Sequence, residues 1–152
     1  MSLHWAALVH EKLAIIAAFA YSQAPLTKLR SERFHGEWRF LEKIIYEIPF
    51  RTATQACMDF ALYFRALDDD ERLTDYWNQV ECPNVGTLFL KDGNTERLSP
   101  REMSNKIIHA ERIEWDFSAE PKIICIGRDK ESWVRAEINV GLLLALGGQL
   151  GS

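Results

Sequence analysis

Three polar side chains follow one another at four-residue spacing in the last third of the sequence. Arg101, Asn105 and His109 occupy positions i, i+4 and i+8, so a helix through them carries all three on one side. A histidine beside an amide and a guanidinium can act as a general acid or base, and an arginine can stabilise negative charge on a phosphate. These three residues are therefore the candidate catalytic residues of the chain.

The same spacing also has a non-catalytic interpretation. The helix rises by roughly 12 Å from Arg101 to His109, so a single chain does not easily bring both side chains to one phosphate. A solvated helix face explains the three residues without any chemistry, and a histidine in the last turn is favoured by the helix dipole. The sequence leaves both interpretations open.

The helix that must position these residues has the clearest start signal in the chain. Ser99, Pro100 and Glu102 supply a capping hydroxyl, a proline at the first helical position and a glutamate at the third position of a capping box. This pattern predicts a helix over residues 100–110. Its apolar side is formed by Met103, Ile107 and Ala110.

The run from Asn105 to Ala110, Asn-Lys-Ile-Ile-His-Ala, resembles the motif helix of HEPN domains (higher eukaryotes and prokaryotes nucleotide-binding). That motif is an arginine, often followed by a polar residue such as asparagine, then three variable residues and a histidine. Asn105 and His109 match its asparagine and histidine, whereas Ser104 occupies the position of its arginine. The resemblance implies a helical bundle, commonly dimeric, found in metal-independent RNases and in non-catalytic relatives. The absence of the arginine favours a non-catalytic relative.

Upstream of this helix the apolar pattern predicts a helical half of the chain, over about residues 1–82. A first helix is predicted over residues 3–22. It is apolar on all sides in its second part, which indicates a buried helix. We expect Pro25 to end it, because the residue before a proline avoids helical angles.

Two longer amphipathic segments and one short one complete this half. A second helix is predicted from Ser31 to Ile48, stopping at Pro49, and a third helix is expected to follow a cap at Thr52. The acidic residues 68–71 resemble a capping box and predict a kink or a short fourth helix. That fourth helix would carry Leu73, Tyr76 and Trp77.

The hydrophobic period then changes from that of helices to that of strands. We predict strands over residues 87–90, 112–117, 122–126 and 133–138, with turns at 92–94 and 127–130. A very apolar helix is expected over residues 140–150, buried either within its own bundle or against a partner.

The predicted fold is mainly α, of the α+β type. It is a compact bundle of about five helices with a small antiparallel sheet in the C-terminal half, about residues 86–152. The length of 152 residues fits a single globular domain over residues 1–152.

Net charge argues against generic attraction to nucleic acid. The whole chain carries a formal charge of −4, and residues 86–135 contain nine Lys/Arg against nine Asp/Glu. Nucleic-acid binders need a basic face to displace counterions from phosphates. The sequence shows no such island around the candidate residues.

Cysteine usage and hydropathy indicate a reducing, cytoplasmic location. Cys57, Cys82 and Cys125 are odd in number and widely separated, so they form neither a disulfide framework nor a Cys-x-x-Cys motif. The apolar run of residues 13–21 is far shorter than the roughly 20 residues that cross a bilayer. We expect no membrane partner, no metal site and no cofactor.

Two functions are compatible with these features. The first is an interaction or ligand-binding module, possibly a non-catalytic HEPN-like protein, that forms a homodimer or binds an unknown protein partner through apolar helix surface. The second is a metal-independent RNase or nucleotide-processing enzyme of HEPN type, in which His109, Asn105 and Arg101 act on RNA or a nucleotide across a dimer cleft.

Overall fold

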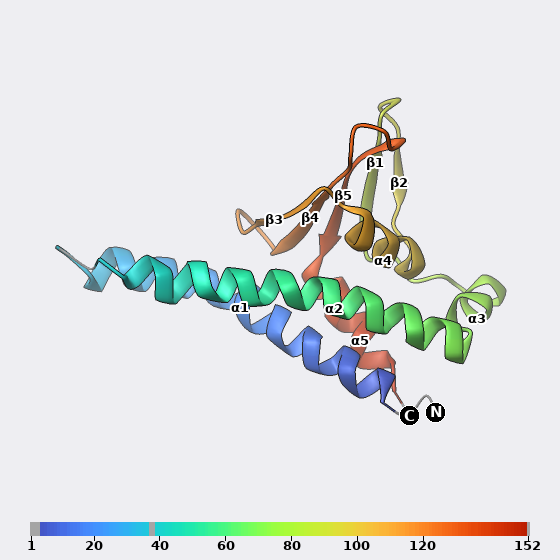
Figure 1. Ribbon diagram of the computed structural model, residues 1–152, viewed down its shortest axis with the longest axis horizontal. Coiled ribbons are helices and arrows are strands. Elements are labelled where there is room, and N and C mark those ends of the chain that lie inside the picture. Colours follow the sequence, from blue (N-terminus) through green and yellow to red (C-terminus); the bar gives the residue numbers. More distant parts are fainter. Residues whose placement is uncertain (1–3, 37–38, 152) are drawn as a thin grey trace.

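The computed structural model describes residues 4–36 and 39–151 (Figure 1). In this part of the chain five α-helices accompany one five-stranded antiparallel sheet, and the sheet lies entirely in the C-terminal half. The predicted fold class, mainly α with a small antiparallel sheet, is therefore confirmed.

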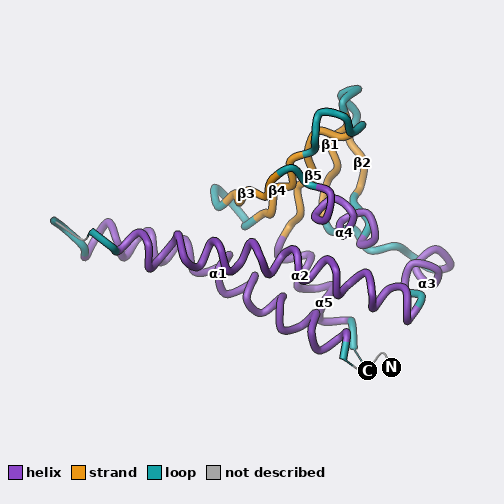
Figure 2. The backbone as a smooth tube through the Cα atoms, in the orientation of Figure 1, coloured by secondary structure: helices purple, strands orange, loops and turns teal. Residues whose placement is uncertain are grey.

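Two long helices form the base of the molecule. α1 (Trp5–Arg33) and α2 (Ile48–Glu71) run side by side in opposite directions, and the far end of this hairpin projects beyond the sheet (Figure 2). Their facing sides supply much of the buried core: Val9, Leu13, Ile16, Ala20, Ala56, Phe60 and Phe64. Within residues 4–36 and 39–151, no helix has the combination of length and apolar character needed to cross a membrane.

The prediction that Pro25 ends the first helix is wrong, since α1 continues through this proline to Arg33. A proline inside a helix removes one backbone hydrogen bond and costs about 3 kcal/mol. The contacts of α1 along α2 offset this cost, because helix stability in proteins comes mainly from packing rather than propensity. Ser31 consequently lies inside α1 and does not begin a second helix.

The prediction that a helix stops at Pro49 is also wrong. A π-helical turn, η1 (Lys43–Glu47), passes directly into α2, and Pro49 lies in the first turn of α2. A proline is tolerated there because the first N–H groups of a helix have no partner within it. Thr52 therefore lies inside α2 and caps nothing, while residues 37–38 of the predicted second helix lie outside the described residues.

The short fourth helix is confirmed as α3 (Leu73–Gln79). It is separated from α2 by Arg72, whose φ of 55° places it in the left-handed region. That single residue breaks the helical path and turns the chain toward the sheet.

The sheet contains β1 (Gly86–Leu90), β2 (Thr95–Arg97), β3 (Arg112–Asp116), β4 (Lys122–Ile126) and β5 (Trp133–Asn139). Its strand order is β2-β1-β5-β4-β3, and every neighbouring pair is antiparallel. The four predicted strands are confirmed with small differences at their ends. The sequence does not predict β2, because its three residues are all polar and exposed and show no apolar alternation.

Two further helices link the sheet to the hairpin. α4 (Pro100–His109) lies between the sheet and α2, and α5 (Val140–Gln149) packs against α1 (Figure 1). The apolar face of α5 is buried within its own chain at Val140, Leu143 and Leu146. The ring of His10 on α1 adds a hydrogen bond of 2.9 Å to the Gly147 carbonyl oxygen.

The close approach of β1 and β5 depends on Gly86, which pairs with Ile138. A Cβ atom at residue 86 would lie 1.9 Å from the backbone oxygen of Glu137. We therefore expect Gly86→Ala to lower the free energy of unfolding by about 2–4 kcal/mol, through forced separation of two strands. Urea unfolding followed by circular dichroism measures this change.

Gly148→Ala is the matched control, because a Cβ there meets no atom within 4 Å. Inside α5 this change should leave stability unchanged or raise it by up to about 1 kcal/mol. Equal unfolding midpoints for the two variants would contradict the tight strand contact.

Candidate functional site

The helix that carries the predicted catalytic residues begins as expected. The Ser99 hydroxyl accepts a hydrogen bond of 3.2 Å from the backbone N–H of Glu102, and α4 starts at Pro100. Arg101, Asn105 and His109 all lie on this helix. Two of them, Arg101 and Asn105, contact side chains of α2, and Arg101 also lines a pocket of about 260 Å³ beside Asp68 and Asp69.

Arg101 forms a bridge between α4 and the end of α2. Its Nη1 donates to Asp68 Oδ2 at 3.0 Å and to Asp69 Oδ1 at 2.8 Å. The hydrogen bond with Asp69, together with that to Asp68, raises the pKa of the Arg101 guanidinium. The group is therefore permanently charged and occupied by carboxylates of its own chain.

Asp68 is the buried member of this network, with 3% of its surface exposed. Its two carboxylate oxygens also accept hydrogen bonds of 2.7 Å from the backbone N–H and the hydroxyl of Thr74 in α3. A buried carboxylate is stable only when it is paired and hydrogen-bonded, and Arg101 and Thr74 meet that requirement. Arg101 thus has a structural role that joins three helices.

Asn105 and His109 have different surroundings. Asn105 Oδ1 accepts a hydrogen bond of 2.8 Å from Arg65 Nη1 on α2. His109 is exposed at the end of α4, and its side chain makes no hydrogen bond or ion pair with the residues the structure describes. The buried Ser104 hydroxyl, at the position of the HEPN arginine, donates to the Arg101 carbonyl at 2.7 Å.

Removal of the Arg101 guanidinium tests its structural role. Arg101→Met should lower the free energy of unfolding by about 2–4 kcal/mol, because it leaves the buried Asp68 carboxylate without its cation. Chemical unfolding measures the difference. Arg72→Met is the control: it breaks an ion pair with Asp75 between two exposed side chains, and such pairs contribute little. A similar decrease in the free energy of unfolding in both variants would show that the burial of Asp68 does not account for the effect of Arg101→Met.

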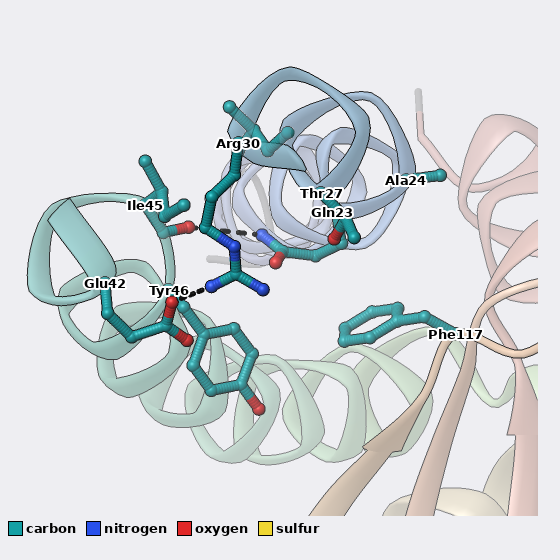
Figure 3. A pocket seen from close by; sticks show the side chains of 9 residues that line it. Gln23, Ala24, Thr27, Arg30, Glu42, Ile45, Tyr46 and Phe117 are labelled. Atoms are coloured by element: carbon teal, nitrogen blue, oxygen red, sulfur yellow. Dashed lines mark hydrogen bonds and ion pairs between the residues drawn. The ribbon is translucent and has the colours of Figure 1, made fainter. Parts of the chain in front are cut away.

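A pocket of about 460 Å³ lies in the projecting part of the hairpin, where α1, η1 and the chain after β3 meet (Figure 3). This volume is in the range of small-molecule sites. Its lining combines aliphatic, aromatic and polar side chains: Gln23, Ala24, Leu26, Thr27, Arg30, Glu42, Ile45, Tyr46 and Phe117.

Gln23 is the buried polar group of this pocket, with 7% of its surface exposed. Its Nε2 donates to the Ile45 carbonyl oxygen at 3.5 Å. Ile45 lies in the π-helical turn η1, so this hydrogen bond connects α1 to the segment that leads into α2. The carboxamide oxygen of Gln23 has no hydrogen-bond partner among the described residues and lies on the pocket side (Figure 3).

Two aromatic side chains of the pocket are held from behind by other rings. Tyr46 stacks on Phe50 with 5.5 Å between ring centroids, and Phe117 stacks on Trp115 at 6.1 Å. Phe19 contacts both pairs, with its ring edge-on to Phe117 at 5.6 Å. The rings of Tyr46 and Phe117 therefore form rigid walls that cannot easily collapse into the pocket.

Charge at the rim is balanced. Arg30 near the end of α1 forms an ion pair with Glu42, just before η1, and this pair closes one side of the pocket (Figure 3). Both side chains are partly exposed, so exchange of the Glu42 carboxylate for another anion costs little desolvation.

The sequence did not indicate these pocket residues. Gln23 and Arg30 were expected at or beyond the end of a helix, so nothing placed them against residues 42–46. No local pattern predicts this contact, because it joins residues that are 22 positions apart in the sequence.

Potential metal ligands are dispersed over the described residues, and two of the three cysteines, Cys57 and Cys125, are buried. No group of three or more histidine, cysteine or acidic side chains is arranged to hold a metal ion there. Burial raises the pKa of Cys125 to about 12 and that of Cys57 well above its ordinary value. Both are therefore protonated core thiols at neutral pH and are poor nucleophiles.

Comparison with known proteins identified no related protein. No protein-family model matches the chain, and neither a curated protein nor a solved structure is significantly similar to it.

Proposed function

We propose that this protein is a non-catalytic binding module and that a small ligand occupies the pocket between α1, η1 and Phe117. The observation that carries this proposal is the Gln23 side chain, which lines the pocket, donates to the Ile45 carbonyl oxygen at 3.5 Å and leaves its carboxamide oxygen unbonded on the pocket side (Figure 3). No buried side-chain nitrogen or oxygen of the described residues lacks a hydrogen-bond partner, so this oxygen is open to solvent and can accept from a ligand donor that displaces water.

The state of the predicted catalytic residues supports a binding function over catalysis. Arg101 is held by Asp68 and Asp69, and Asn105 is held by Arg65. Neither residue shares a partner with His109. A catalytic histidine needs a second group within reach of the same reacting atom.

The proposal also includes a cytoplasmic location and a homodimer or protein complex. All three cysteines are free, which supports a reducing, cytoplasmic compartment. A homodimer, or an unknown protein partner, would use the apolar residues exposed on the projecting part of the hairpin rather than α5. These include Phe40, Ile44 and Ile48, which follow one another at four-residue spacing.

The pocket is tested by titration with small aromatic probes, namely phenol, benzamide and para-hydroxybenzoate, followed by amide chemical shifts in NMR spectra. At least one probe should shift signals around Gln23 and Ile45. Tyr46→Ala should weaken that binding by roughly tenfold, because it removes one aromatic wall.

Tyr76→Ala provides the control, since Tyr76 is an exposed tyrosine on α3. It should leave the titration unchanged. The absence of any shift around Gln23 with all three probes, or equal weakening in both variants, would argue against the pocket as a binding site.

One observation favours a second function, a metal-independent RNase of HEPN type. Arg65 approaches Asn105 from α2, so an arginine stands beside the matched asparagine although Ser104 replaces the arginine of the motif. In this proposal His109 is the acid or base, and Arg65 contacts the phosphate, with Arg101 holding the helix in place.

His109→Ala separates this function from binding in the pocket. His109 is exposed, so the substitution should change the free energy of unfolding by no more than about 0.5 kcal/mol while abolishing RNA cleavage measured with a chelator present. His4→Ala, another exposed histidine, should retain cleavage. A wild-type protein that leaves RNA intact, or cleavage that survives in His109→Ala, would rule out the RNase.

A further inference from the structure

The chemistry of the pocket also restricts what kind of ligand fits. We infer that the ligand is a small planar aromatic carboxylate that also carries a hydrogen-bond donor. This inference rests on the proposed binding function and concerns the same pocket.

The aromatic part of the ligand follows from the two backed rings. Tyr46 and Phe117 lie on either side of the opening in Figure 3 and are each stacked on a second ring from behind. Rings fixed in this way lose little freedom when another ring packs against them, and aromatic pairs contribute beyond their buried area. An aliphatic ligand would not gain this contribution.

The carboxylate follows from Arg30. Its Nη1 is paired with Glu42, but a guanidinium has five N–H donors in a planar fork. Figure 3 shows this fork directed toward the space between Tyr46 and Phe117. Elsewhere in the same chain Arg101 binds two carboxylates at once, Asp68 and Asp69. Arg30 can likewise hold a ligand carboxylate beside Glu42.

The donor on the ligand follows from Gln23. Its Nε2 donates one of its two N–H groups to the Ile45 carbonyl oxygen, and in this orientation the carboxamide oxygen lies on the pocket side (Figure 3). This oxygen accepts from a hydroxyl or N–H group of the ligand. The three requirements together describe a hydroxy- or amino-substituted aromatic acid.

Calorimetric titration of the full chain with para- and meta-hydroxybenzoate, each compared with its neutral benzamide analogue, tests the inference. At least one acid should bind roughly tenfold more tightly than its amide, as expected for a charge-assisted fork on Arg30. Arg30→Gln should reduce this preference to about twofold or less. Lys28→Gln, an exposed cation on the same helix but outside the lining, should preserve it.

Glu42→Gln supplies a second, independent arm. Because it removes a carboxylate that competes for Arg30, it should strengthen binding of the acid relative to that of the amide by roughly threefold or more. Equal affinity for acid and amide in the wild type would overturn the ligand class while leaving the pocket function intact. If none of the four compounds binds to the wild type or to Glu42→Gln, the inferred ligand class is wrong. If phenol, benzamide and para-hydroxybenzoate also cause no shift around Gln23 in the NMR titration, the proposed binding function is wrong as well.

Discussion

The buried carboxylate of Asp68 is the interaction on which the arrangement of the helices depends. It lies in the last turn of α2, accepts hydrogen bonds from Thr74 in the first turn of α3 and binds Arg101 of α4. Removing a carboxylate from water is expensive unless charge and hydrogen bonds replace the water, so all three partners must be in place together. The corner between α2 and α3 and the docking of α4 on α2 are thus one cooperative unit. Because α4 contacts both α2 and β5, and its Met103 and Ile107 belong to the buried core, the sheet is positioned on the hairpin through the same contact.

Local signals predicted the elements of the C-terminal half well. The cap at Ser99, the alternation in residues 112–117 and the apolar run after residue 140 each specify an element without help from distant residues. The two prolines misled the interpretation of the N-terminal half for the opposite reason. Pro25 and Pro49 are local signals for the end of a helix, but the packing of α1 on α2 stabilises the helix through Pro25, and Pro49 occupies the first turn of α2, where a proline is tolerated.

The candidate site shows the same difference between what local sequence signals predict and what distant residues determine. The spacing of Arg101, Asn105 and His109 correctly predicts a shared helix, but it contains no information about what lies opposite. The partners are Asp68 and Arg65, more than thirty residues away, and they turn two candidate catalytic groups into contacts between helices. The pocket could not be predicted from the sequence for a further reason. Its walls come from three segments, and one of them, the π-helical turn, has no recognised signature in sequence.

The strand order also constrains the course of folding during synthesis. β1 with β2, and β3 with β4, are two separate hairpins between neighbours in sequence, and β5 is the strand that joins them. Since β5 follows all four in the chain, the ribosome exposes two unconnected hairpins before a continuous sheet can exist. Both hairpins have open edges facing the gap that β5 later fills, and such edges can pair with other chains. The α1–α2 hairpin is complete well before that stage and contributes a prebuilt apolar surface. A nascent chain of this protein is thus most exposed to wrong pairing in the interval between the synthesis of β4 and that of β5.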